Sequence, residues 1–299
     1  MRTFTATPLP TERYTLGEGI RWDEVRQELA WVDIAGISSR MMRARVSDES
    51  VDIVATHEFA PNFTVFAPFA DRSLGWLAGY NDAIVRFTQG GDVVHLVTLE
   101  PGTAGTLRTN DGTADPWGGF WVGTMGTRGH EPIGSLYRYV NGEVTTVREG
   151  CTIPNGTSWS ADGRTMYCTD SALGTIFRAP VDEAGWPGTF EPFIVFPDPS
   201  MEAPDGHCID ERGHLWVAVW GGREVREFTP EGELVGRVAV DAHQVSCCTI
   251  GGPSGTTLFI TTAQEGYSAE DSRRDPHAGK LFRCEIDVRG RSLLAASAF

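Results

Sequence analysis

Four side chains with oxygen donors recur at one position of a repeated pattern in this sequence. Each lies 11 to 13 residues before an aromatic residue that leads a short apolar run, and each stands beside a glycine or a turn: Glu18, Asn110, Asn155 and Asp205, before Trp31, Trp121, Tyr167 and Trp216. Carboxylate and amide oxygens are hard ligands that suit a divalent cation such as Ca²⁺, Mg²⁺ or Mn²⁺. Zinc is an alternative, although it more often binds His or Cys. Each residue alone could be an ordinary turn former, but four at one position of the repeat favour a shared metal site.

The repeat predicts how these residues come together. Short runs led by an aromatic residue return at intervals of 43 to 49 residues, at Trp31, Trp76, Trp121, Tyr167, Trp216 and Phe259. A period of this length, built from short strands and turns, is typical of propeller blades. We therefore expect an all-β fold, a six-bladed β-propeller in a single domain over residues 1–299, with almost no helix. The innermost strands of a propeller line a central channel, which we expect to hold one divalent metal.

Composition agrees with an all-β protein and excludes some partners. The 299 residues include 35 Gly and 17 Pro, and the formal net charge is −15. An acidic surface disfavours nucleic-acid binding. The N-terminus shows no apolar leader, and no segment is apolar enough to span a bilayer. We expect a cytoplasmic monomer or small homo-oligomer with no membrane or nucleic-acid partner.

The six cysteines fit neither a zinc-binding pattern nor a thioredoxin pattern. We expect reduced and mostly buried thiols, as in cytoplasmic proteins. The alternative, a secreted protein with disulfides, lacks a signal peptide. Both ends of the chain, Thr3–Ala6 and Ser292–Ala296, resemble strands, and either could pair to close the sheet edges.

Two further residues stand two positions from the candidate ligands. Strand alternation predicts that Arg108 shares a face with Asn110, and His207 with Asp205. Arg108 could hold an anionic or hydroxyl-rich substrate, or pair with Glu18 or Asp111. His207 could contact the substrate, although a lone histidine is more often packed or exposed.

Other polar residues favour a structural interpretation. Asp33, Asp170 and Asp210 occupy repeated strand-end or turn positions. No Gly-x-Ser-x-Gly motif is present, so a serine hydrolase is disfavoured.

At these residues the sequence resembles the SMP-30/gluconolactonase/regucalcin-like family. The resemblance covers nearly the whole chain and rests on these motifs: Leu16–Gly19, Arg108–Gly112, Phe120–Met125, Pro154–Gly156, Pro204–Gly206, Trp216–Gly222 and Thr261–Ala263. It implies a six-bladed propeller with one divalent metal that hydrolyses sugar lactones to sugar acids.

The resemblance also implies roles for individual residues. Glu18, Asn155 and Asp205 match the metal ligands of the family, and Asp205 matches the proposed general base that activates water. Arg108 and Asn110 match positions that contact substrate. The metal could be Ca²⁺, Zn²⁺, Mg²⁺, Mn²⁺ or Fe²⁺.

The segment Gly126–His130 departs from the family pattern. Related proteins can carry an acidic substrate-contacting residue here, whereas this chain has Arg128 and His130. One interpretation is that Arg128 accommodates a negatively charged lactone, and the other is an exposed loop.

The leading hypothesis is therefore a metal-dependent sugar lactonase. One alternative is a hydrolase of non-sugar lactones or esters, and another is a non-catalytic calcium-binding regulatory propeller. A WD-type interaction platform is disfavoured because the repeats do not end in Trp-Asp.

Overall fold

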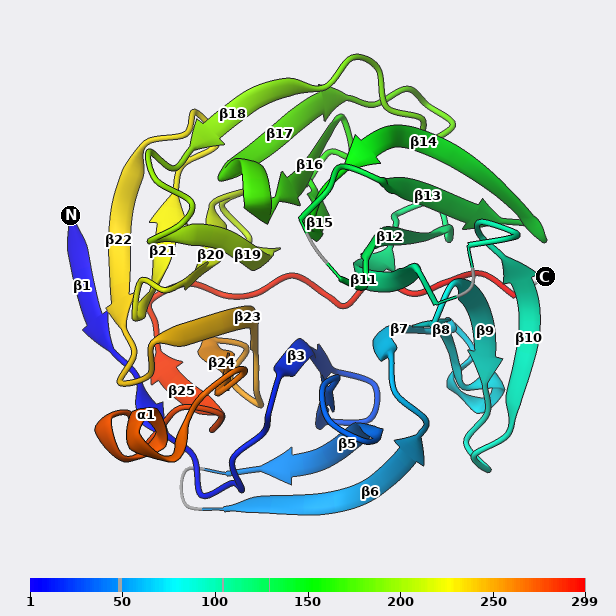
Figure 1. Ribbon diagram of the computed structural model, residues 1–299. Coiled ribbons are helices and arrows are strands. Elements are labelled where there is room, and N and C mark those ends of the chain that lie inside the picture. Colours follow the sequence, from blue (N-terminus) through cyan, green and yellow to red (C-terminus); the bar gives the residue numbers. More distant parts are fainter. Residues whose placement is uncertain (48–49, 104, 129, 299) are drawn as a thin grey trace. The chain divides into compact units, whose positions relative to one another are not determined.

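The computed structural model describes residues 1–47, 50–103, 105–128 and 130–298, and β-strands dominate its regular structure (Figure 1). The chain divides into two compact units. Unit 1 comprises Met1–Phe59 and Phe196–Leu293, and unit 2 comprises Ala60–Val195 and Leu294–Phe299. Each unit therefore combines segments that are distant in the sequence. The predicted all-β class is confirmed.

In the described part of unit 2, three antiparallel sheets are each built from four strands consecutive in the sequence. The strands are β7 (Phe63–Pro68), β8 (Trp76–Tyr80), β9 (Ala83–Phe87) and β10 (Val93–Thr98); β11 (Leu107–Ala114), β12 (Phe120–Gly126), β13 (Gly134–Val140) and β14 (Glu143–Cys151); and β15 (Pro154–Trp159), β16 (Thr165–Asp170), β17 (Thr175–Pro180) and β18 (Glu191–Val195). Two one-turn 3₁₀ segments accompany them, η1 (Arg72–Leu74) and η2 (Ser171–Leu173). Sheets of four antiparallel strands are the unit from which propellers are built.

The described residues of unit 1 form one sheet of four strands and one of nine. The first contains β3 (Gly17–Asp23), β4 (Glu28–Asp33), β5 (Ser39–Val46) and β6 (Val51–Phe59). The larger sheet contains β19 (Ala203–Ile209), β20 (Leu215–Trp220), β21 (Glu224–Phe228), β22 (Leu234–Ala239), β23 (Gln244–Gly251), β24 (Thr257–Ala263), β25 (Phe282–Glu285), β1 (Arg2–Thr5) and β2 (Thr7–Pro8). The pair Trp220 and Gln244 joins its two halves, so each half corresponds to one repeat of the sequence.

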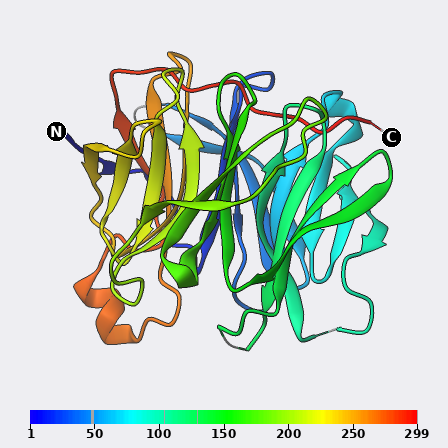
Figure 2. The same cartoon turned by 90° about the horizontal axis from the view of Figure 1, so that it is seen from above.

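A single short α-helix, α1 (Ala269–Arg274), lies among the described residues, between β24 and β25. It projects beyond the ends of the strands of its own unit (Figure 2). Ser268 and Asp271 form a capping box that satisfies the first N–H groups of this helix. The expectation of almost no helix is confirmed. No helix in the described ranges combines the length and the apolar character needed to cross a membrane.

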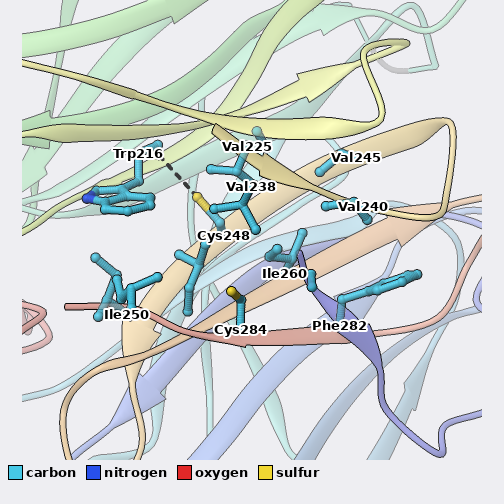
Figure 3. Close-up of a cluster of buried hydrophobic side chains, with 14 of the residues drawn as sticks. Trp216, Val225, Val238, Val240, Val245, Cys248, Ile250, Ile260, Phe282 and Cys284 are labelled. Atoms are coloured by element: carbon cyan, nitrogen blue, oxygen red, sulfur yellow. Dashed lines mark hydrogen bonds between the residues drawn. The ribbon is translucent and has the colours of Figure 1, made fainter. Parts of the chain in front are cut away.

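We call each four-stranded sheet, and each half of the nine-stranded sheet, a strand group. The predicted aromatic strands are the second strands of these groups in sequence order: β4, β8, β12, β16, β20 and β24. All six leading aromatic side chains are buried. In unit 1, Trp216 packs in a cluster with aliphatic side chains of β21 to β24, such as Val225 and Ile260 (Figure 3). Burial of a large aromatic in every repeat explains why the period is visible in the sequence.

The strand prediction for the N-terminal end is confirmed, because β1 pairs in parallel with β22 and β2 pairs with β25. The prediction for Ser292–Ala296 is wrong in its extent. The described backbone there makes an isolated bridge between Ala296 and Phe69 in unit 2. Leu294 and Ala296 also insert into apolar clusters of that unit. Side-chain packing and two backbone hydrogen bonds of Ala296, with Pro68 and Ala70 (2.9 Å each), therefore hold this segment without a continuous ladder.

The six cysteines are all free thiols; five are buried and Cys208 is partly exposed, which confirms the expected reduced and mostly buried state. Cys248 donates to the carbonyl of Trp216 (3.1 Å, Figure 3). Burial raises the pKa of Cys151 to about 11 and that of Cys168 to about 12. The thiolate is the reactive form. These two thiols are therefore unreactive for two reasons: reagents cannot reach them, and they stay protonated.

We expect a disulfide reagent at pH 8 to modify about one cysteine in the native protein, Cys208, and all six after unfolding. Thiol titration with and without denaturant, followed by peptide mass spectrometry, measures this difference. Rapid labelling of Cys151 or Cys168 in the native state would contradict the burial described above.

Candidate metal and substrate site

The first strand of each four-stranded group carries a β-bulge, and the candidate ligands lie at these bulges. Against the second strand, the register slips between Glu18 and Arg21 in β3, Thr109 and Gly112 in β11, Asn155 and Thr157 in β15, and Pro204 and His207 in β19. In β7 and β23 the register shifts at the equivalent point of the strand. A bulge leaves an extra residue out of the ladder and redirects its side chain. The four oxygen-bearing residues share a position in the repeat because they share this local distortion.

In unit 1, Glu18 is 8% exposed, and the backbone around it is fixed at several points. Asp33 Oδ1, at the end of β4, accepts a hydrogen bond from the Leu16 N–H (2.9 Å), and the Ser246 hydroxyl donates to the Gly17 carbonyl (2.5 Å). The Gly19 N–H donates to Glu18 Oε2 (3.1 Å). A buried carboxylate needs such compensation, and a bound cation would add a stronger one.

Asp205 lies in the bulge of β19 and is 5% exposed. The next residue must be glycine, because a Cβ on Gly206 would lie 2.5 Å from Cys247 Sγ and 2.8 Å from Cys247 Cβ on β23. Close approach of β23 therefore requires the Pro204-Asp205-Gly206 motif to end in glycine. The motif noted in the sequence has a packing reason as well as a chemical one.

The sequence did not single out Arg21, which unit 1 places beside the candidate residues. Arg21 Nη1 donates to the Ile20 carbonyl (2.9 Å) and lies 3.7 Å from Cys247 Sγ. Burial lowers the pKa of His207 to about 3, and the positive charge of Arg21 adds to this effect. His207 is therefore neutral near pH 7 and can serve as a hydrogen-bonding group there.

The alternation argument for His207 does not hold in the structure. The bulge falls between Pro204 and His207, so a count of two residues from Asp205 no longer fixes the face of the strand. His207 is 6% exposed, and its contact with substrate remains a prediction.

In unit 2, a chain of hydrogen bonds links the predicted residues of β11 and β15. Arg108 Nη1 donates to Asn110 Oδ1 (2.8 Å), and Asn110 Nδ2 donates to Asn155 Oδ1 (3.1 Å). Asn155 Nδ2 in turn donates to Ser171 Oγ (2.9 Å). The predicted proximity of Arg108 to Asn110 is confirmed, although the connection runs through a bulge. This series of hydrogen bonds fixes the Asn155 amide so that its oxygen faces Asn110.

The structural interpretation of Asp33 and Asp170 is confirmed. Asp170 Oδ2 and Oδ1, at the end of β16, accept the N–H groups of Thr152 (2.8 Å) and Ile153 (3.1 Å). In unit 1, Asp33 holds the Leu16 N–H in the same way. These carboxylates fix the backbone just before Asn155 and Glu18, and so position both candidate ligands.

Asp210, His214 and Glu227 form a second group of potential metal ligands, with atoms within 4.8 Å of one another. Arg212 Nη2 lies 3.3 Å from Asp210 Oδ2 and 3.1 Å from Glu227 Oε1, and Arg2 also binds Glu227. The two guanidinium groups already compensate these carboxylates. Asp210 also accepts the indole N–H of Trp216 (3.1 Å), which confirms its structural interpretation.

Arg128 and His130 are exposed. Arg128 follows β12 and lines a hollow in unit 2 with residues of β11 and of the β8–β9 turn. The exposure of both residues is compatible with either interpretation of this segment, and the contact of Arg128 with a ligand stays a prediction.

The donor chemistry of each unit suits a hard divalent cation. Unit 1 contains the buried carboxylates of Glu18 and Asp205. Taken by itself, unit 2 contains the buried amide oxygen of Asn155. Oxygen donors of this kind suit Ca²⁺, Mg²⁺ or Mn²⁺. Asn155 Oδ1 accepts one hydrogen bond from Asn110, and a carbonyl oxygen has a second lone pair for a cation.

The chain is similar to several known proteins. The family model described as "SMP-30/Gluconolactonase/LRE-like region" matches residues 16–264. The L-arabinolactonase of Azospirillum brasilense is 34% identical over 93% of this chain and 90% of the relative. A pentonolactonase of Haloferax volcanii is 32% identical over 96% of each chain.

Among solved structures, regucalcin from Agrobacterium tumefaciens, named as a calcium-binding protein, superimposes with a TM-score of 0.88. Its sequence is 27% identical, and the match covers 100% of both chains.

Proposed function

Because the chain belongs to the SMP-30/gluconolactonase/LRE-like family, we propose that it is a lactonase, a carboxylic-ester hydrolase that opens a sugar lactone to the sugar acid. Relatives named as lactonases match at 32% to 34% identity over more than nine-tenths of the chain. The observation that carries the proposal is the shared bulge position of Glu18, Asn155 and Asp205, each buried in a first strand.

We further propose that the four-stranded groups form one six-bladed propeller in a single domain, with Glu18, Asn155 and Asp205 around one divalent cation. The repeat of the sequence and the recurrence of the bulge in every first strand support this arrangement. When bound, the cation supplies Lewis-acid polarisation of the lactone carbonyl and charge that stabilises the developing oxyanion.

Asp205 acts as the general base of the proposed reaction. It accepts a proton from the water molecule that attacks the carbonyl carbon of the lactone. The bond between that carbon and the ring oxygen then breaks, and Asp205 returns the proton to the departing oxygen. The reaction consumes one water molecule and yields the hydroxy acid, with no net change at Asp205.

Arg108 and Asn110 orient the substrate in this proposal. Arg108 is fixed by its hydrogen bonds to Asn110 and to the Thr109 carbonyl, and a guanidinium group is of a kind that binds hydroxyl or carboxylate oxygens. An oriented substrate reduces the entropic part of the barrier.

A panel of lactones separates the proposal from its alternatives. We expect hydrolysis of at least one sugar lactone well above its spontaneous rate, and slower turnover of a non-sugar γ-lactone and an aryl ester. A pH-indicator assay at constant buffer strength measures all of them. Preference for the non-sugar compounds would favour a general lactone or ester hydrolase.

The second candidate function is a non-catalytic calcium-binding protein, which the similarity to a structure named as calcium-binding favours. It expects calcium binding without turnover of any compound in the panel. Calcium titration by calorimetry alongside the hydrolysis assay distinguishes the two functions.

A further inference from the structure

Unit 2 contains a hollow of about 500 Å³ beside the strand that carries Arg108 and Asn110. Its lining comes from the residue before β7, the β8–β9 turn, the start of β11 and the segment after β12: Asn62, Asn81, Asp82, Gly105, Leu107, Thr127 and Arg128. This volume lies within the range of ligand pockets. The hollow is open and most of its lining residues carry polar side chains, so it suits one end of a hydroxyl-bearing molecule more than an enclosed apolar ligand.

The two charged groups of the hollow are available to a ligand. Among the described residues, neither the Asp82 carboxylate nor the Arg128 guanidinium group makes a hydrogen bond or ion pair. A carboxylate accepts hydrogen bonds and a guanidinium group donates them. Their formal charges cancel, so the hollow offers both roles without a net charge.

The asparagine pair gives the hollow a fixed wall. Asn62 and Asn81 both have positive φ (74° and 52°), a conformation uncommon outside glycine. Asn62 Nδ2 donates to Asn81 Oδ1 (3.1 Å), and the Asn81 N–H donates to the Asn62 carbonyl (2.9 Å). The Asn81 carbonyl accepts the Thr109 N–H (2.5 Å). The wall is thus attached to β11 between Arg108 and Asn110.

From this arrangement we propose that the hollow binds the hydroxylated carbons of a sugar lactone that lie outside its ring. This inference rests on the proposed function and assigns new roles to Asp82, Asn62 and Asn81. Hydroxyl groups both donate and accept hydrogen bonds, so they can satisfy Asp82, the amides and Arg128 together. A carboxylate at the same place could pair with Arg128 but would be repelled by the Asp82 anion, whereas a hydroxyl group can bind both, so an acidic lactone is the poorer match. Arg128 therefore recognises hydroxyl groups in company with Asp82, in place of the negatively charged lactone that was one of the two interpretations of the sequence.

The test compares three γ-lactones on the wild type and on Asp82→Asn and Arg128→Gln. A four-carbon aldono-γ-lactone has no carbon outside the ring, a six-carbon one has two hydroxylated carbons there, and a six-carbon aldaro-γ-lactone ends in a carboxylate. We expect both substitutions to lower kcat/KM for the six-carbon aldonolactone about tenfold, the scale of one hydrogen bond to a charged group. The four-carbon lactone should change less than about twofold, and Asp82→Asn should improve turnover of the acidic lactone.

Glu143→Gln, on the outer strand β14 of the same unit, is the matched control for lost charge, and thermal melting checks that each variant is folded. Equal effects on four-carbon and six-carbon lactones would overturn the proposal. Loss confined to the acidic lactone in Arg128→Gln, with no effect of Asp82→Asn, would also overturn it.

A binding measurement separates this proposal from the proposed function. Saturation-transfer NMR with a six-carbon sugar alcohol should show contact with the wild type that weakens in Asp82→Asn. Contact without any lactone turnover would refute the lactonase function and leave the hollow as a polyol site. Turnover without such contact would refute the proposed role of the hollow and leave the lactonase function standing.

Discussion

Replacing Asp205 with asparagine should lower kcat for lactone hydrolysis by about 10²- to 10⁴-fold while the protein remains folded. The substitution keeps the shape of a side chain that is 5% exposed in β19, but an amide cannot accept the proton of the attacking water. The expected loss is the usual contribution of a general base. Steady-state kinetics on the best lactone of the panel, corrected for spontaneous hydrolysis, measures it.

Asp198→Asn is a suitable control for the Asp205 experiment. Asp198 is exposed in the same unit, and its Oδ1 accepts the Ser200 N–H (3.1 Å), a role that asparagine can retain. The control should keep wild-type kinetics. If Asp205→Asn keeps kcat within about tenfold of the wild type at an unchanged melting temperature, another group is the base.

Removal of divalent cations should abolish turnover, and one equivalent of cation should restore it. Glu18→Gln should weaken cation binding by about 10- to 100-fold, because a neutral amide replaces one of the two buried carboxylates of unit 1. Asn155→Leu should weaken it as well, because the amide oxygen is removed. Metal content by plasma emission and cation titration by calorimetry measure both effects.

Two controls locate the cation. Glu231→Gln removes an exposed charge in unit 1 and should leave binding unchanged. His214→Gln changes the other group of potential ligands, in which Arg2 and Arg212 already bind Glu227, and should also have no effect. Full turnover by metal-free protein would refute the mechanism, and cation loss in His214→Gln would move the site to Asp210, His214 and Glu227.

The strand positions could be predicted because each repeat encodes them locally. Trp31 and Trp216 are buried within β4 and β20, and turn residues flank every such run. The structural role of Asp170 could also be predicted, because Asp170 and Asp33 lie at equivalent strand ends in their repeats. The proximity of Arg108 to Asn110 could be predicted because the two residues lie two positions apart on one strand.

The bulges could not be predicted, because register depends on the partner strand and no local residue specifies it. A glycine next to Glu18, Asn155 and Asp205, and two residues after Asn110, was the available signal. The burial of His207 and the influence of Arg21 on it depend on contacts between strands nearly 190 residues apart in the sequence. The convergence of Glu18, Asn155 and Asp205 on one cation stays a prediction.

The pairing of β1 with β22 and of β2 with β25 has a consequence for biosynthesis. The first eight residues leave the ribosome long before Leu234–Ala239 and Phe282–Glu285, the strands that they join. At about 5–20 residues per second, this delay is roughly a quarter of a minute to a minute. During that time the nascent N-terminal segment has no strand to pair with. Chaperones that bind this segment should therefore affect the yield of folded protein. A solubility tag fused at this end should affect the yield more than the same tag at the other end.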